Sequence, residues 1–128
     1  MANEEFRELV RQFVLPVILD HRMAGHRLAA TLHHRYGVSS MVCGPRKNLL
    51  DLVDPNTAFL LLFRERSASL AMEQLLDFAR EYGELILLLI PMNREQRLFL
   101  DAHRDLLESH YIISDPEAVF SQAPLANF

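Results

Sequence analysis

The chain has 128 residues, half of them hydrophobic and 23% charged, with a formal net charge of −4 at pH 7. This length fits one domain with a substantial core, and the composition excludes an extensively disordered protein. The negative charge and the scattered basic residues disfavour nucleic-acid binding, which needs a basic surface along the phosphates.

The first part of the chain predicts a helix followed by a strand-helix-strand unit. Asn3 is placed to cap the first helix, whose apolar stripe is expected to pack on the core and consists of Phe6, Leu9, Val10 and Phe13. Residues 14–19 form a short apolar run that predicts a strand. Residues 23–36 have helical periodicity that Gly37 closes, and residues 38–44 predict a second strand. A right-handed crossover between two parallel strands follows.

The middle of the chain continues the alternation. Residues 47–53 predict a short helical or irregular connection. The run TAFLLLF, residues 57–63, has no polar alternation and predicts a strand buried on both faces. Ser67 or Ser69 can begin the next helix, and Gly83 lies at its end.

The last elements are a strand, a helix and a strand. Residues 85–90 are the most hydrophobic run and predict the central strand of the sheet. Asn93 and Gln96 resemble a capping pair at the start of a helix that reaches about Ser109. The residues of this helix that we expect to face inward are Leu98, Phe99, Ala102, Leu106 and Leu107. Residues 111–113 predict a fifth strand.

Strands that alternate with helices through short loops predict an α/β fold. We expect a three-layer Rossmann-like parallel sheet of about five strands, with helices on both faces, in a single domain over residues 1–128. No internal repeat is present.

Polar residues follow the first strand, where open α/β sheets bind ligands. Asp20, His21, Arg22 and Gly25 lie in this loop, and the helix start that follows offers N–H groups to an anion. Arg22 can add a bidentate contact to a carboxylate or phosphate. The alternative is structural: Asp20 caps the helix and Gly25 permits close packing of strand and helix.

Three other loops are expected at the same edge of the sheet. Arg46 follows the second strand, Arg64 the third and Asn93 the fourth, so all three can line one cleft with Asp20. The alternatives are a solvated turn for Arg46 and a helix cap for Asn93. No catalytic constellation can be read in these residues, and we predict no catalytic residue in this chain.

Two familiar kinds of site are disfavoured by the sequence. The loop DHRMAG after the first strand is not the Gly-x-Gly-x-x-Gly of dinucleotide-binding folds, which argues against NAD. Among the six histidines, His26 and His33 can share a helix face, but no carboxylate or cysteine pattern completes a metal site. We therefore predict solvated or hydrogen-bonded histidines and no bound metal.

The cellular setting is predicted from the cysteine count and from the apolar runs. A single cysteine, Cys43, excludes an internal disulfide and is expected to be a buried apolar side chain. The acidic N-terminus is unlike a signal peptide. The longest apolar run, residues 85–92, is far shorter than the roughly 20 residues of a membrane span. We expect a cytoplasmic location without membrane contact.

Three segments carry a resemblance to a known family. LPVILDHRMAGHRLAATLHHRYGVSS contains a strand, a loop and a helix that ends HHRYG. ELILLLIPMNREQRLFLDAHRDLLESHYII contains a strand that ends in Ile-Pro, a helix with a leucine pair and a short strand with a tyrosine. DPEAVF follows. Together, residues 14–120 resemble the amino-terminal Rossmann-like (pre-ATP-grasp) domain of ATP-grasp ligases, particularly the group of D-aspartate ligase and the carbamoyl-phosphate synthase large chain.

The resemblance implies a non-catalytic domain of an ATP-dependent carboxylate-amine ligase. In that family, the two following domains bind ATP and magnesium, and this domain helps to shape the acceptor-substrate site. The chain would then hold no cofactor, and its partner would be the adjoining ATP-grasp domain, toward which residues 115–128 would lead. It would be an isolated module or a truncated piece of a longer protein. The loop departs from the family at Asp20, where a glycine is usual.

A second interpretation stays open. The chain can be a free-standing flavodoxin-like module that recognises a small anion or a partner protein through its strand-end loops. The tail has no charged residue after Glu117 but carries Phe120, Leu125 and Phe128. Such a terminus is expected to pack on the sheet edge or to mediate a homodimer.

Overall fold

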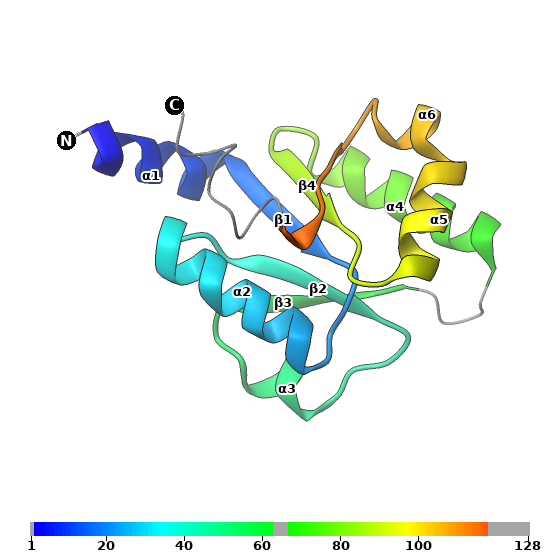
Figure 1. Cartoon of the computed structure of the whole chain (residues 1–128), viewed down its shortest axis with the longest axis horizontal. Coiled ribbons are helices and arrows are strands. Elements are labelled where there is room, and N and C mark those ends of the chain that lie inside the picture. Colours follow the sequence, from blue (N-terminus) through cyan, green and yellow to red (C-terminus); the bar gives the residue numbers. More distant parts are fainter. Residues whose placement is uncertain (1, 63–66, 118–128) are drawn as a thin grey trace.

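The computed structural model describes residues 2–62 and 67–117, and it has one sheet with helices on both sides (Figure 1). The helices are α1 (Ala2–Phe13), α2 (Met23–Tyr36), α3 (Leu49–Val53), α4 (Ala68–Glu81), α5 (Arg94–Ala102) and α6 (Arg104–Leu107). The strands are β1 (Val14–Ile18), β2 (Ser40–Gly44), β3 (Thr57–Leu61), β4 (Ile86–Ile90) and β5 (Ile112–Ile113).

The strand order is β3-β2-β1-β4-β5, and every neighbouring pair is parallel. Ile18 of β1 is paired with Val42 on one side and with Ile90 on the other. The predicted three-layer Rossmann-like fold is confirmed. The central strand is β1, however, and β4 lies beside it. From β1 the chain winds outward through β2 to β3 and then returns to β4, so the strand order reverses between β1 and β4.

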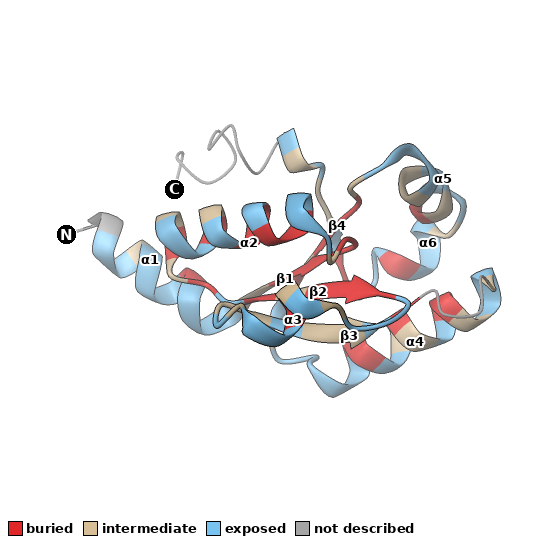
Figure 2. Ribbon diagram, turned by 90° about the horizontal axis from the view of Figure 1, so that it is seen from below, coloured by how far each residue is buried: buried red, intermediate tan, exposed pale blue. Residues whose placement is uncertain are grey.

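Two apolar clusters lie on the two faces of the sheet (Figure 2). Successive side chains of a strand point to opposite faces, and β1 serves both clusters. Ile18 packs with the apolar residues of α1 and α2, whereas Val17 packs with those of α4, α5 and α6. Both side chains are fully buried. Because β1 is covered on both faces, its carboxyl end is held in place, and so is the start of the loop that follows it.

Two helix ends behave as their sequences predict. Gly37 follows α2 with φ 73°, the left-handed conformation that glycine adopts without strain, and its N–H donates to the carbonyl of His33 at 2.8 Å. Ser67 caps α4, since its Oγ accepts the N–H of Leu70 at 3.2 Å. This decides between the two serines considered as the start of that helix.

Helix α1 differs from its prediction in two ways. The helix begins at Ala2 and therefore includes Asn3, which was expected to precede it as a cap. Val10 is buried, but Leu9 and Phe13 are 56% and 46% exposed. The main contacts of α1 are with α2 and β1, so the core covers only one edge of the predicted stripe.

The helix predicted to reach Ser109 is divided into α5 and α6 at His103. The ring Nδ1 of His103 donates to the carbonyl of Phe99 at 2.9 Å, the acceptor that the backbone N–H of His103 would use in a continuous α-helix. That N–H instead meets the carbonyl of Leu100 at 3.2 Å. The side chain therefore competes with the backbone and ends the helix.

Part of the predicted inward face of this helix is wrong. Leu100 and Leu107 are fully buried and Phe99 packs against the core. The other three residues predicted to face inward are exposed: Leu98, Ala102 and Leu106. Two of them, Leu98 and Ala102, precede the break, so the wrong flank of α5 was predicted to face the core.

Strand β3 is shorter and less buried than the run 57–63 predicted. It ends at Leu61 and forms one edge of the sheet, and both Ala58 and Leu61 are exposed. Arg64 and the tail residues Phe120, Leu125 and Phe128 lie outside the described residues. Within residues 2–62 and 67–117, no helix has both the length and the apolar character needed to cross a bilayer.

Candidate functional site

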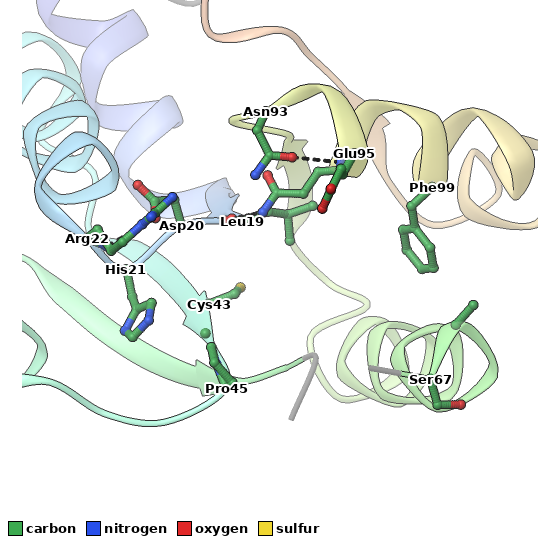
Figure 3. A pocket seen from close by; sticks show the side chains of 13 residues that line it. Leu19, Asp20, His21, Arg22, Cys43, Pro45, Ser67, Asn93, Glu95 and Phe99 are labelled. Carbon is green, nitrogen blue, oxygen red and sulfur yellow. Dashed lines mark hydrogen bonds and ion pairs between the residues drawn. The ribbon is translucent and has the colours of Figure 1, made fainter. Parts of the chain in front are cut away.

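A cleft of about 780 Å³ opens at the carboxyl ends of β1, β2 and β4 (Figure 3). This is where the strand order reverses, and a crevice at such a reversal is the usual ligand site of open α/β sheets. The cleft is lined by Leu19, Asp20, His21 and Arg22 after β1, by Cys43, Gly44 and Pro45 at the end of β2, by Ser67 and Ala68 at the start of α4, and by Asn93, Glu95, Gln96 and Phe99 around the start of α5.

The structure brings together four of the residues singled out from the sequence. Asp20, His21, Arg22 and Asn93 all line the cleft. The other three have different positions. Gly25 is packed behind Asp20, Arg46 is exposed and does not line the cleft, and Arg64 lies outside the described residues.

The carboxylate of Asp20 occupies the N-terminal end of α2. Its Oδ2 accepts the N–H of Gly25 at 2.9 Å, and its Oδ1 accepts the N–H of Arg22 at 3.2 Å and the Nε–H of Arg22 at 3.1 Å. The residue is buried. The positive end of the helix is therefore neutralised by the chain itself, which agrees with the capping role for Asp20 and not with an open anion site at this helix end.

Gly25 allows α2 to begin directly against the end of β1. A β-carbon at this position would lie 2.1 Å from the carbonyl oxygen of Asp20, far inside any contact distance. The neighbour is backbone, so it cannot rotate away. The loop 20–25 is therefore tight because of this glycine, and that tightness fixes where His21 and Arg22 point.

Asn93 and Gln96 build the opposite rim. Oδ1 of Asn93 accepts the N–H of Gln96 at 2.9 Å, so Asn93 caps α5 as its sequence position predicts. Gln96 differs from a standard capping box, because its Oε1 accepts the N–H of Met92 at 2.7 Å. Its Nε2 donates to the carbonyl of Leu19. One side chain thus ties the loop after β4 to the end of β1.

His21 lies against the floor of the cleft. Its ring packs over Gly44, where a β-carbon would come within 2.4 Å of Nε2. Its other face is near Phe59, with the ring centroids 5.6 Å apart. Nδ1 lies 2.8 Å from Oδ2 of Asp51. The histidine is therefore fixed by a glycine, an aromatic ring and a carboxylate.

Asp51 is the centre of a buried polar network that connects the cleft to α3. Its side chain is fully buried, and its Oδ1 lies 2.8 Å from Nε2 of His26. Nδ1 of His26 lies 2.7 Å from Oδ2 of Asp54. The N–H of Asn48 also donates to Oδ2 of Asp51 at 2.8 Å, and the N–H of Asp51 donates to Oδ1 of Asn48 at 3.0 Å. These two bonds form the capping box that begins α3.

The hydrogen bonds determine the charge states in this network. Carboxylates only accept hydrogen bonds, so both ring nitrogens of His26 must donate and the ring is an imidazolium. Burial lowers the pKa of His26, but hydrogen bonds to Asp54 and Asp51 outweigh that effect and raise it above the usual value. Burial likewise raises the pKa of Asp51, but hydrogen bonds from His21, Asn48 and His26 bring the net value below the usual one.

This network was not predicted from the sequence. No local carboxylate pattern completes a site with His26, because Asp51 and Asp54 follow it by 25 and 28 residues. A local signal was present, since Asn48 and Asp51 have the spacing of a capping box. That spacing predicts the start of α3, but it does not predict which histidines α3 will meet.

Cys43 lines the cleft but has little reactivity. It is 2% exposed, and burial raises the pKa of its thiol. This confirms the expected buried apolar role. Within the described ranges, no three His, Cys, Asp or Glu side chains are arranged to hold a metal ion. The described residues of the cleft therefore offer hydrogen-bonding groups and charge.

Comparison of the chain with protein-family models, with curated proteins and with solved structures finds no match.

Proposed function

We propose that this chain is a ligand-binding Rossmann-like domain of the kind found at the amino terminus of ATP-grasp ligases. In this proposal the chain alone catalyses no reaction. Its cleft helps to shape the site for the acceptor substrate of a carboxylate-amine ligase, and the adjoining ATP-grasp domain binds ATP and magnesium. A cytoplasmic location belongs to the same proposal, because the chain has one buried thiol and no disulfide.

The observation that carries the proposal is the position of the cleft. It lies at the point where the strand order reverses, and its walls come from the loops after β1, β2 and β4. Those walls are held firmly: Asp20 is locked onto α2, and Gln96 ties the rims together. A preformed cleft of this size with a few polar groups suits a small molecule.

The chemistry of the lining supports a binding role in place of catalysis. No glycine-rich phosphate loop follows β1, and Asp20 already occupies the end of α2 where a phosphate would bind. Of the cleft's ionisable groups, Asp20 is paired with Arg22 at 3.1 Å. His21 and Glu95 remain as groups that can accept hydrogen bonds from a ligand.

Backbone-amide NMR with the whole chain tests the binding role. We would titrate glycine, ethanolamine and acetate, which separate the amine and carboxylate parts of an acceptor substrate. The proposal predicts that at least one of them shifts amides at Asp20, Gly44 and Glu95 selectively. Shifts in none of these amides, or shifts confined to distant helices, would refute it.

Two further observations separate this proposal from a free-standing interaction module. The coding sequence is expected to continue beyond Phe128 into a nucleotide-binding domain. A stop codon there would favour the free-standing module. Light scattering decides whether the chain also pairs with a second copy, as the apolar residues Phe120, Leu125 and Phe128 suggest.

A further inference from the structure

The tautomer of the neutral His21 ring is set by Asp51. Asp51 is fully buried, its pKa lies below the usual value, and its carboxylate can only accept hydrogen bonds. Its Oδ2 lies 2.8 Å from Nδ1 of His21. The side-chain amide nitrogen of Asn48 lies 3.3 Å from the same Nδ1, but it makes its shorter hydrogen bond, at 3.0 Å, to the carbonyl of His21. The contact with the carboxylate is the shorter of the two at Nδ1, and a carboxylate needs a donor there, so in the neutral ring the proton belongs on Nδ1 and the lone pair on Nε2.

His21 lines the cleft, and its Nε2 has no hydrogen-bond partner within residues 2–62 and 67–117. The ring of His21 lies over Gly44, which also lines the cleft, and a β-carbon on Gly44 would come within 2.2 to 2.6 Å of three ring atoms. Nδ1 makes the ring's polar contacts with the described residues, and the side chain of His21 is 15% exposed to solvent. The lining of the cleft thus includes a ring nitrogen that the described residues leave without a partner, on a ring that Asp51 and Gly44 hold in place.

The charges of the network favour a donor at this nitrogen. His26 contributes one positive charge, whereas Asp51 and Asp54 contribute two negative charges, which leaves the group with a net charge of about −1 when His21 is neutral. Glu95, on α5, adds a second acceptor to the lining of the same cleft. Asp20 and Arg22 cancel each other. A ligand group that carries N–H or O–H, above all an ammonium, meets a favourable field here.

We propose that His21, positioned by Asp51, is the hydrogen-bond acceptor through which the cleft binds an amine or hydroxyl group of its ligand. This inference rests on the proposed function and narrows it. The ligand class becomes a small molecule with a donor group, and a simple anion is disfavoured. The role of Asp51 is positioning, since it acts on the ligand only through His21.

The first test is the tautomer of His21, measured from the ring ¹⁵N shifts of the whole chain. The neutral wild-type ring is expected to be Nδ1–H, with Nε2 unprotonated. Asp51→Asn removes the obligatory acceptor and should shift the ring toward the Nε2–H form. Asp54→Asn is the matched control, because Asp54 contacts His26 and not His21. It should leave the tautomer unchanged. A neutral wild-type ring in the Nε2–H form would overturn the proposal.

The second test titrates ethanolamine and acetate and follows the Nε2 signal. Ethanolamine, which carries N–H and O–H donors, is expected to move it; acetate, which carries none, is not. His21→Phe keeps a ring over Gly44 and should weaken ethanolamine binding by about ten-fold, the equivalent of one lost hydrogen bond to a charged group. Unchanged binding would overturn the inference.

Different results would refute the binding role of the cleft and the acceptor role of His21. If a ligand shifts the cleft amides but leaves the His21 ring signal and the His21→Phe affinity unchanged, the cleft binds ligands and the role of His21 is wrong. If ethanolamine moves neither the amides nor the ring signal, the inference is overturned together with the amine part of the binding proposal.

Discussion

The carboxylate of Asp51 lies 2.8 Å from the imidazole of His26, although 25 residues separate them in the chain. His26 is in the second turn of α2, and Asp51 is in the capping box of α3. The same carboxylate reaches His21 at 2.8 Å. One buried acid therefore joins two helices to the loop that follows the central strand, and it holds the floor of the cleft.

Asp51→Asn is predicted to lower the free energy of unfolding by about 3 kcal/mol. It removes the negative charge of a buried ion pair and leaves the positive charge of His26 without that partner. Asp54→Asn should cost less, about 1 kcal/mol, because the side chain of Asp54 is 17% exposed and water can replace part of the contact. Urea denaturation of both variants measures the difference. Equal losses would show that Asp51 is not the centre of the network.

The stability of the chain is predicted to fall as the pH rises above the ordinary histidine pKa. Folding raises the pKa of His26, so the folded state holds this proton more tightly than the unfolded chain. The stabilisation is complete below the ordinary histidine pKa of 6.5 and is lost as the pH rises through the higher folded value. Urea midpoints across this range provide the measurement. His26→Gln should flatten the dependence, and an identical slope in that variant would contradict this origin.

Glycine 25 is predicted to be required for folding. Gly25→Ala puts a methyl group 2.1 Å from the carbonyl oxygen of Asp20, which forces the backbone to shift and should cost about 3 kcal/mol. Gly83→Ala is the matched control, since its β-carbon would come no closer than 3.3 Å to its nearest neighbour. Thermal melting compares them. Similar melting temperatures for the two variants would mean that the loop 20–25 can accommodate the methyl group without a loss of stability.

The sequence was sufficient to predict most of the fold, because helix ends and strand positions depend on local patterns. Gly37 and Ser67 marked helix boundaries that the structure confirms. The break at His103 was missed because a side-chain bond to the carbonyl of Phe99 has no signature in periodicity. The exposure of Leu98, which lies within α5, was missed separately, because periodicity alone did not fix which flank of the helix faces the core.

The candidate site was only partly predictable. The loop after β1 could be found because parallel strands place their carboxyl ends at one edge, and Asp20 and Asn93 do line one cleft. The pairing of His26 with Asp51 depends on how α3 is placed against α2. Such a tertiary contact over 25 residues cannot be deduced from the spacing of one sequence.

The isolated chain is predicted to bind ATP-magnesium weakly or not at all. Asp20 places a carboxylate at the N-terminus of α2, and no glycine-rich loop surrounds that position, so a triphosphate would meet repulsion where it needs N–H donors. Isothermal titration calorimetry with the whole chain provides the measurement. A micromolar complex would contradict the assignment of nucleotide binding to an adjoining domain.

The central claim is that the cleft at the carboxyl edge of the sheet binds the ligand, and a blocking substitution tests it most directly. Ala68 lines the cleft and is exposed, so Ala68→Trp can fill the space without disturbing the core. Ala102→Trp is the control, because Ala102 is exposed and does not line the cleft. The measurement is the Kd for ethanolamine by NMR titration. We predict that Ala68→Trp weakens binding by about ten-fold or more while Ala102→Trp leaves it unchanged; an unchanged Kd in the properly folded Ala68→Trp variant would contradict the claim.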